Sequence, residues 1–180
     1  IASMLKSLVL QSGGLRDEPA DLLTFLNSFL FDQTGVHYIT AFYGIYNLKD
    51  NSLKYCNAGH CSPYVITGNG IYQLEHNRAL PLAIMNNDLL EKSNKQYSNI
   101  EIVMEKNSKL LIYTDGLTEA TKLDDADRED YFEYTLFPEI CRRAFQYPCH
   151  RFLDEIFRGL INFRGSHKFE DDICMICIDV

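Results

Sequence analysis

Two acidic positions beside apolar segments are the residues best suited to chemistry. Asp115-Gly116 follows the apolar run 110–113. Asp171-Asp172 precedes a second apolar run, 173–178. A carboxylate at a strand end can face a cleft, and the two ends meet if the strands are neighbours. Such carboxylates suit hard cations such as Mg²⁺ or Mn²⁺. Asp-Gly is also a common turn, and on spacing alone the turn is the stronger interpretation.

A second turn-like segment, Asn57-Ala58-Gly59-His60, follows another predicted strand. Asn and Gly tolerate the positive φ angles of tight turns, so a structural turn is the simpler interpretation. The alternative is that Asn57 and His60 lie near a functional site at the end of their strand.

The six cysteines do not form a recognisable metal or redox motif. Cys174 and Cys177 have C-x-x-C spacing, but residues three apart on a strand point to opposite faces and cannot readily hold one ion or form a redox pair. No second C-x-x-C is present, which excludes a zinc ribbon. Cys61 has no identifiable base, so a catalytic thiol is not indicated. We expect reduced cytosolic thiols at Cys56, Cys61, Cys141, Cys149, Cys174 and Cys177.

The overall charge limits the partners of this chain. The 180 residues carry a formal net charge of −8, which argues against nucleic-acid binding and against docking on anionic lipid. No apolar run approaches the roughly 18 residues of a membrane span, and the first residues do not resemble a signal peptide. One acidic run is expected to be a solvated loop or, alternatively, a flap over a metal site. It contains Asp124, Asp125, Asp127, Glu129 and Asp130.

Hydrophobic periodicity predicts an α+β fold with mainly antiparallel sheets. Two helices are expected first, one ending at Gly13-Gly14 and the next beginning at Pro19. Hairpins dominate the middle of the chain, which argues against a doubly wound parallel sheet. Residues 76–97 are expected to be loop with one short buried piece. The expected strands are 37–46, 53–57, 64–67, 71–74, 100–104, 109–114 and 172–179. Two further helices are expected at 131–145 and 152–163.

Four segments, in this order and spacing, resemble one family. They are 40–44 (Thr-Ala-Phe-Tyr-Gly), 53–60 (Leu-Lys-Tyr-Cys-Asn-Ala-Gly-His), 111–120 (Leu-Ile-Tyr-Thr-Asp-Gly-Leu-Thr-Glu-Ala) and 171–173 (Asp-Asp-Ile). Together they are similar to the stage II sporulation protein E-like phosphatases, a bacterial branch of the metal-dependent (type 2C) protein phosphatases. The resemblance extends over essentially the whole chain, and its most specific part is 113–120.

The resemblance implies a fold and a set of site residues. The implied fold is a four-layer α-β-β-α sandwich with its metal site at one end. Asp115 and Asp171 match the metal ligands of the family, and Gly116 completes the Asp-Gly motif. Asn57 and His60 match a turn near the site. Asp172 takes the place of an Asn or Asp that supports the ligands.

The resemblance also implies an activity and partners. The expected reaction is hydrolysis of phosphoserine or phosphothreonine by a water activated between two Mn²⁺ or Mg²⁺ ions. The expected substrate is a phosphorylated anti-anti-sigma-type regulator in the cytoplasm, under control of an upstream sensor domain. Apolar positions on the first helix indicate a possible homodimer or signalling interface, although core packing explains them equally well.

One family motif is absent from this chain. The motif Asp-x-x-Gly-His-Gly, which supplies an aspartate that bridges both ions, is expected just before Ile1 together with one or two strands. Residues 1–180 are therefore expected to form a single phosphatase-like domain without its N-terminal part, with weak or no activity alone. Two alternatives remain: a non-catalytic regulatory or interaction module that keeps the fold, and an unrelated metal hydrolase, which does not explain the other segments.

Overall fold

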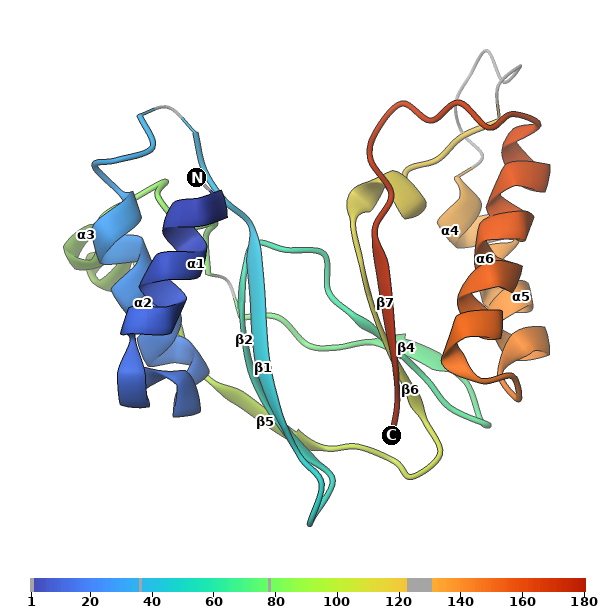
Figure 1. The fold of residues 1–180 in the computed structure, drawn as a ribbon, viewed down its shortest axis with the longest axis horizontal. Coiled ribbons are helices and arrows are strands. Elements are labelled where there is room, and N and C mark those ends of the chain that lie inside the picture. Colours follow the sequence, from blue (N-terminus) through green and yellow to red (C-terminus); the bar gives the residue numbers. More distant parts are fainter. Residues whose placement is uncertain (1, 36, 78, 123–130) are drawn as a thin grey trace. The chain divides into compact units, whose positions relative to one another are not determined.

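The computed structural model describes residues 2–35, 37–77, 79–122 and 131–180. The chain forms two compact units. Unit 1 contains residues 1–60 and 75–104, and unit 2 contains residues 61–74 and 105–180. Each unit combines helices with one antiparallel sheet, as the ribbon shows (Figure 1). Because each unit has its own sheet and its own apolar cluster, they are described separately.

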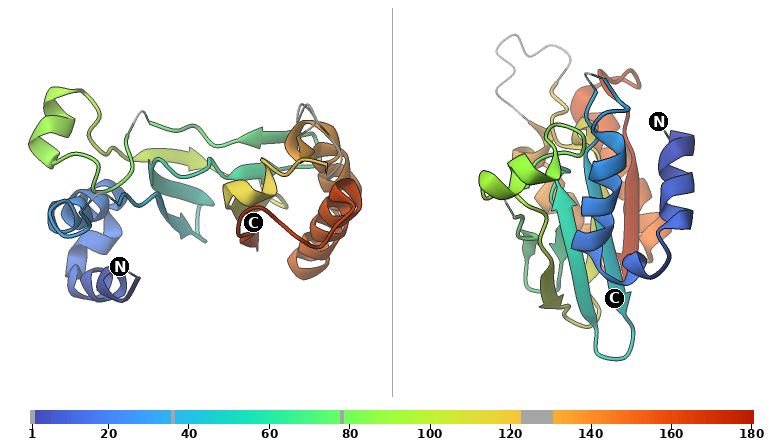
Figure 2. Two further views of the ribbon diagram at one scale, coloured as in Figure 1. Left: turned by 90° about the horizontal axis from the view of Figure 1, so that it is seen from above. Right: turned by 90° about the vertical axis from the view of Figure 1, so that its left-hand side faces the viewer.

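Unit 1 is a three-stranded sheet with helices packed against it. The sheet has the order β1-β2-β5, and both pairs are antiparallel. Helices α1 and α2 lie side by side, and α2 packs on the sheet (Figure 2). The elements are α1 (Ala2–Gln11), a 3₁₀ turn η1 (Gly13–Asp17), α2 (Pro19–Leu30), β1 (Ala41–Asn47), β2 (Ser52–Ala58), α3 (Asn87–Lys92) and β5 (Ile100–Val103).

The core of unit 1 forms where the apolar stripe of α2 meets β2. Pro19 is at the first helical position, where its missing N–H is not needed. The buried leucines of α2 then pack with Cys56 and Ala58. The side chain of Asn27 is also buried; it donates to Met85 O (2.9 Å) and accepts from Ala83 N (2.8 Å). These hydrogen bonds fasten the apolar segment 80–85 to α2, so the short buried piece expected within 76–97 is present.

Unit 2 carries the aspartates singled out in the sequence. Its four-stranded antiparallel sheet has the order β4-β3-β6-β7. In the part of unit 2 that the structure describes, three helices accompany the sheet. The elements are β3 (Tyr64–Ile66), β4 (Ile71–Gln73), β6 (Lys109–Tyr113), a 3₁₀ turn η2 (Asp115–Leu117), α4 (Phe132–Thr135), α5 (Phe137–Ala144), α6 (Cys149–Arg164) and β7 (Met175–Asp179).

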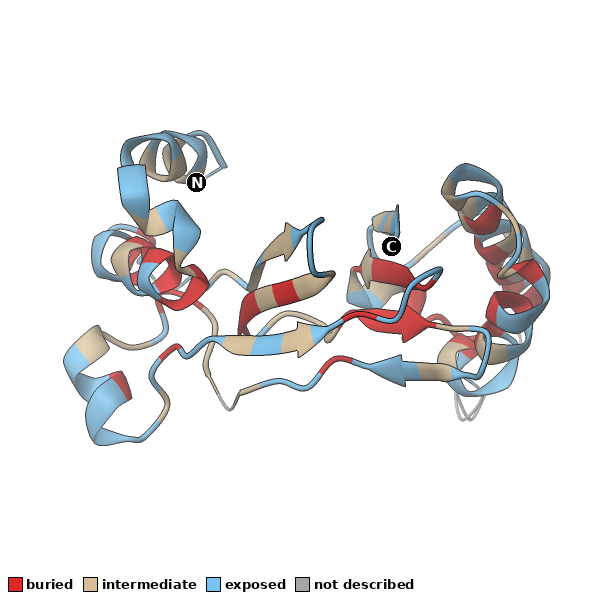
Figure 3. Ribbon diagram, turned by 90° about the horizontal axis from the view of Figure 1, so that it is seen from below, coloured by how far each residue is buried: buried red, intermediate tan, exposed pale blue. Residues whose placement is uncertain are grey.

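The core of unit 2 is rich in aromatic side chains from its helices. Phe132, Phe137 and Phe152 are fully buried together with Leu111 of β6, and the buried positions of α5 and α6 are red in Figure 3. Helices α5 and α6 approach closely at Gly159, where a Cβ would lie 2.1 Å from Ile140 Cδ1. The sheet that holds the aspartate segments therefore rests on a packed helical layer.

The predicted α+β class with antiparallel sheets is confirmed, and two details of the prediction are wrong. The strands predicted at 100–104 and 109–114 form; β5 pairs with β2 and β6 pairs with β3 and β7, so they belong to different sheets. Residues predicted as loop contain α3, which Asn86 caps by accepting from Leu89 N (2.9 Å). The predicted helix 131–145 is two helices that meet at Leu136, just before Pro138.

Smaller differences concern the ends of two strands. The first strand begins at Ala41 rather than at 37, and the last begins at Met175 rather than at 172. The acidic run 124–130 lies outside the described residues. Among the helices that the structure describes, none has the length and apolar character needed to cross a membrane.

We expect the aromatic core of unit 2 to dominate its stability. Phe152 is 0% exposed, whereas Phe157 on the same helix is 39% exposed. Phe152→Ala should lower the free energy of unfolding by about 3–5 kcal/mol, because it leaves a cavity among the buried rings. The matched change Phe157→Ala should cost about 1 kcal/mol. Denaturant unfolding monitored by circular dichroism measures both; equal losses would contradict this description of the core.

Candidate metal centre

The pairing of β6 with β7 brings the two predicted metal-binding aspartates to one end of the sheet. The strands are antiparallel, and Tyr113 at the end of β6 is opposite Met175 at the start of β7. One residue further on, Thr114 N donates to Cys174 O (3.1 Å). Asp115, which follows β6, and Asp171, which precedes β7, therefore lie on neighbouring segments. The condition set by the sequence, that the two strands be neighbours, is met.

The hydroxyl group of Thr114 joins these two segments. Its Oγ1 donates to Asp172 O (2.9 Å) and accepts from Cys174 N (2.9 Å). Thr114 directly precedes one predicted ligand, and Asp172 directly follows the other. The side chain of Thr114 thus extends the hydrogen bonding between β6 and β7 beyond their last pair, Tyr113 and Met175. The segments that carry Asp115 and Asp171 begin at this point.

Gly116 allows the two segments to touch. A Cβ at this position would lie 2.7 Å from Asp172 O and 3.3 Å from Asp171 O. The first distance is shorter than real contacts of this kind, and both neighbours are backbone atoms that cannot swing aside. Only glycine therefore fits at position 116, where the chain passes the backbone of Asp171 and Asp172. The Asp-Gly motif thus has a packing explanation that does not depend on metal.

Both carboxylates are exposed and each is oriented by a local hydrogen bond. Asp115 Oδ1 accepts from Gly116 N (3.1 Å), and Asp171 Oδ1 accepts from Asp172 N (2.7 Å). The side chain of Asp172 is also exposed. Exposed carboxylates on touching segments repel one another, and a divalent cation would relieve this repulsion.

The turn after Asp115 is anchored by the buried residue Leu117. η2 is closed by hydrogen bonds from Thr118 N and Glu119 N to Asp115 O, both 2.9 Å. Leu117 is 0% exposed and belongs to the aromatic core. The backbone that carries Asp115 is therefore fixed on one side by Thr114 and on the other by the core.

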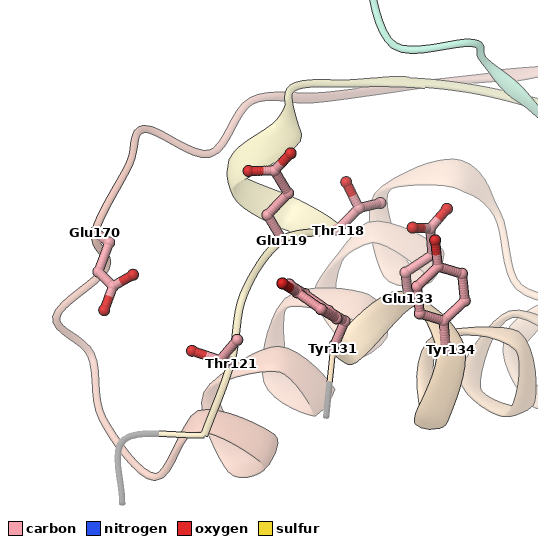
Figure 4. Close-up of a pocket in the computed structure, with 7 residues that line it drawn as sticks. All are labelled: Thr118, Glu119, Thr121, Tyr131, Glu133, Tyr134 and Glu170. Carbon is pink, nitrogen blue, oxygen red and sulfur yellow. The ribbon is translucent and has the colours of Figure 1, made fainter. Parts of the chain in front are cut away.

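An acidic pocket of about 530 Å³ lies beside this turn (Figure 4). Glu119 follows η2, Glu133 belongs to α4 and Glu170 directly precedes Asp171. Such a lining favours a cation or a positively charged group. The residues around the pocket are Thr118, Glu119, Thr121, Tyr131, Glu133, Tyr134 and Glu170.

A smaller pocket of about 80 Å³ is lined by Asp171 and Gly116 and also by an arginine. Arg164, at the end of α6, is buried and bonds to Lys168 O (2.5 Å) and Thr121 O (3.4 Å). Its guanidinium also lies 3.6 Å from a carboxylate oxygen of Glu170. Arg164 thus ties the segment that leads to Asp171 to the segment after η2. The pocket is lined by Gly116, Glu119, Ala120, Arg164, Phe169, Glu170 and Asp171.

The donor set fits a hard divalent cation but is incomplete. Carboxylate oxygens are the ligands that Mg²⁺ and Mn²⁺ prefer, and Asp115 and Asp171 supply them from touching segments. Within the described ranges, no group of three or more His, Cys, Asp or Glu side chains is placed to hold a metal ion. Further ligands, from water or from other protein residues, would be needed.

Asn57 and His60, predicted near the site, belong to unit 1, and the relative position of the two units is not determined. Within unit 1 they close a turn: Asn57 Nδ2 donates to His60 O, and His60 N donates to Asn57 Oδ1, both at 2.8 Å. Gly59 between them has φ +68°, and a Cβ there would lie 2.5 Å from Pro81 Cγ. The structural turn that the sequence suggested is therefore present.

Cys61 does not have the properties of a catalytic thiol. Burial raises the pKa of Cys61, and the negative charge of Asp115 raises it further. A thiol with a raised pKa is protonated and weakly nucleophilic at neutral pH.

Sequence reasoning missed several residues of this region. Arg164 and Glu170 gave no signal, because their contact with the aspartate segments depends on how α6 ends and returns to β7. Thr114 and Glu119 lie inside the most specific family-like string, 113–120, so their positions there could have identified them.

Solved structures with a similar fold were found, whereas no curated protein sequence matched. The RsbU and RsbW domains of Rv1364c from Mycobacterium tuberculosis align with 97% of this chain and 45% of theirs, at 21% identity and a TM-score of 0.71. The SiaA PP2C domain of Pseudomonas aeruginosa aligns with 95% of this chain and 64% of its own, at 17% identity and a TM-score of 0.75. This chain thus spans less than two thirds of both. The curated proteins contain no significant match.

A third structure is the phosphatase domain of the cell fate determinant SpoIIE from Bacillus subtilis, presoaked with Mn. It aligns with 99% of this chain and 72% of its own, at 16% identity and a TM-score of 0.59. At these identities the likeness establishes the fold, which is that of the PP2C phosphatase domains.

The family itself is identified by sequence. The four segments with family-like spacing include both touching aspartate segments of unit 2. A profile of the family described as Stage II sporulation protein E (SpoIIE) matches residues 1–180, the entire chain. This chain therefore belongs to the SpoIIE family.

Proposed function

We propose that this chain is part of a metal-dependent protein phosphatase that hydrolyses phosphoserine or phosphothreonine. The observation that carries the proposal is the junction at Thr114, whose hydroxyl bonds to Asp172 O and Cys174 N at 2.9 Å. This junction holds the segments of Asp115 and Asp171 together, and membership of the SpoIIE family supports a phosphatase.

In this proposal Asp115 and Asp171 hold divalent cations, Mn²⁺ or Mg²⁺. Bound cations would activate a water molecule for attack and neutralise charge on the phosphoryl group. Gly116 lets the ligand segments touch, Thr114 keeps them in register, and Arg164 holds the segment that leads to Asp171. The proposal needs further ligands, which we expect from the family motif Asp-x-x-Gly-His-Gly upstream of Ile1. The Mn presoak of the Bacillus subtilis SpoIIE structure supports the choice of metal.

The proposed substrate is a phosphorylated anti-anti-sigma-type regulator in the cytoplasm. Support comes from the family and from the Mycobacterium tuberculosis structure, in which RsbU and RsbW domains belong to one protein. A sensor or regulatory domain upstream would control the activity. The acidic pocket with Glu119, Glu133 and Glu170 suits a basic segment of such a substrate.

A second candidate is a phosphatase-fold module that binds a partner without catalysis. It is favoured by one observation: in the part of the chain that the structure describes, no set of three metal-ligating side chains is assembled. The two candidates differ in whether a longer chain, extended upstream by about 60 residues, releases phosphate.

Substitution of Asp115 tests the enzyme directly. In the extended chain with Mn²⁺, Asp115→Asn should lower phosphate release from a phosphoserine regulator by at least about 100-fold, because a metal ligand is lost. The circular dichroism spectrum and thermal midpoint should stay close to those of the wild type. Asp154→Asn, an exposed change on α6, is the matched control and should keep full activity. Unchanged turnover in Asp115→Asn would refute the site assignment.

Metal binding by residues 1–180 alone should be weak. Two carboxylates on touching segments should bind one Mn²⁺ ion with a Kd above roughly 0.1 mM, measured by isothermal titration calorimetry. Asp171→Asn should remove this binding, whereas Asp154→Asn should not. Tight binding of two ions by residues 1–180 would contradict the incomplete donor set.

Thr114 should be a positioning residue for the ligands. Thr114→Val keeps the shape but removes the hydroxyl that bonds to the Asp171 segment, so the Mn²⁺ affinity of the extended chain should fall by about 10–100-fold. Thr114→Ser, which restores the hydroxyl, should recover the affinity. Thr135→Val, which removes a hydroxyl that donates to the backbone oxygens of Tyr131 and Phe132 at the start of α4, is the control. Equal affinities for Thr114→Val and wild type would show that the junction does not position the metal ligands.

A further inference from the structure

Two thiols from distant parts of the sequence meet in unit 2. The Cys149 thiol donates to Cys177 Sγ, and the two sulfur atoms are 2.8 Å apart. Both cysteines are free thiols and partly buried. A disulfide bond is about 2.05 Å long, so the sulfur atoms need to move less than about 1 Å to bond.

Local structure explains why these two cysteines meet. Cys149 is the first residue of α6, after Pro148, and Phe152 is fully buried one turn later. Cys177 lies in the middle of β7, opposite Leu111 of β6, and packs against the aromatic core beneath α6. Cys174, which shares the C-x-x-C spacing with Cys177, is exposed. Cys177 thus has its thiol partner on the helix.

The contact lies away from the candidate metal centre. Cys177 is in the middle of β7, whereas Asp171 precedes the start of this strand. The charged groups next to the pair are Lys109 and Asp179, which form an ion pair with each other. The two thiols therefore belong to a separate feature of unit 2, and nothing in the phosphatase proposal requires them.

We propose that Cys149 and Cys177 are a modification site at which a peroxide oxidises the two thiols to a disulfide. In the first step the Cys149 thiolate attacks one oxygen of hydrogen peroxide, giving Cys149 sulfenic acid and hydroxide, which takes up the thiol proton as water. In the second step the Cys177 thiol displaces the sulfenic oxygen as water and the S–S bond forms. The balance is two thiols and one hydrogen peroxide to one disulfide and two waters.

The surroundings of the pair set when the reaction occurs. Burial raises the pKa of both thiols. Both are therefore protonated at neutral pH and react slowly with oxidants. Cys149 is the first residue of α6, and a helix N-terminus favours the thiolate, so Cys149 is the sulfur that peroxide oxidises first.

The disulfide would link the helical layer of unit 2 covalently to its sheet. It would join the start of α6 to β7 and close a loop that contains the rest of α6, Arg164 and Asp171. Closing such a loop restricts the unfolded chain and so stabilises the folded one. The oxidised chain should melt about 5–10 °C higher than the reduced chain.

The test is oxidation of the purified, reduced chain with hydrogen peroxide. We expect loss of two free thiols, a Cys149–Cys177 cross-linked peptide in non-reducing mass spectrometry, and a rise in the thermal midpoint that dithiothreitol reverses. Cys149→Ser and Cys177→Ser should each abolish the cross-link and the rise in midpoint.

Cys174→Ser is the matched control, because it removes an exposed thiol three residues from Cys177 and should leave the cross-link intact. A cross-link that involves Cys174, or conversion of Cys149 to sulfinic acid without a disulfide, would overturn the proposal. Retention of all six thiols after treatment would do the same. None of these measurements depends on phosphatase activity. Their failure would therefore leave the phosphatase proposal untouched, and the reverse also holds.

Discussion

The antiparallel pairing of β6 with β7 is the constraint on which the rest of unit 2 depends. It places the end of β6 beside the start of β7. Asp115 and Asp171, 56 positions apart in sequence, therefore lie at the same end of the sheet. The hydroxyl of Thr114 then extends the pairing by two hydrogen bonds. Each is worth about 1 kcal/mol net, so together they help to hold the two short segments in register.

The same pairing organises what surrounds the aspartates. Gly116 permits contact between the segments because no side chain fits. Arg164 reaches back from α6 to hold the approach to Asp171, and Leu117 anchors the turn after Asp115 in the core. The acidic pocket beside the turn adds negative charge. The resulting negative electrostatic potential would favour both the binding of a cation and the recognition of a basic substrate segment.

Part of this arrangement could be predicted from sequence. An aspartate after one apolar run and another before a second run point to convergence whenever the runs are neighbouring antiparallel strands, and they are. Local signals failed where tertiary context decides. Asn86 caps a helix of six residues that has little hydrophobic periodicity, and no local pattern shows that β5 and β6 belong to different sheets. The Cys149–Cys177 contact depends on how α6 packs on β7, and no spacing rule contains that information.

Paramagnetic line broadening tests the central interaction most directly, because it reports which backbone segments lie near a bound ion. Mn²⁺ would be titrated into isotopically labelled chain while the amide NMR signals are followed. We predict that residues 114–119 and 170–174 lose intensity together and before the rest of unit 2. Broadening of one of these segments without the other, or of a different part of unit 2 first, would contradict a cation held between Asp115 and Asp171.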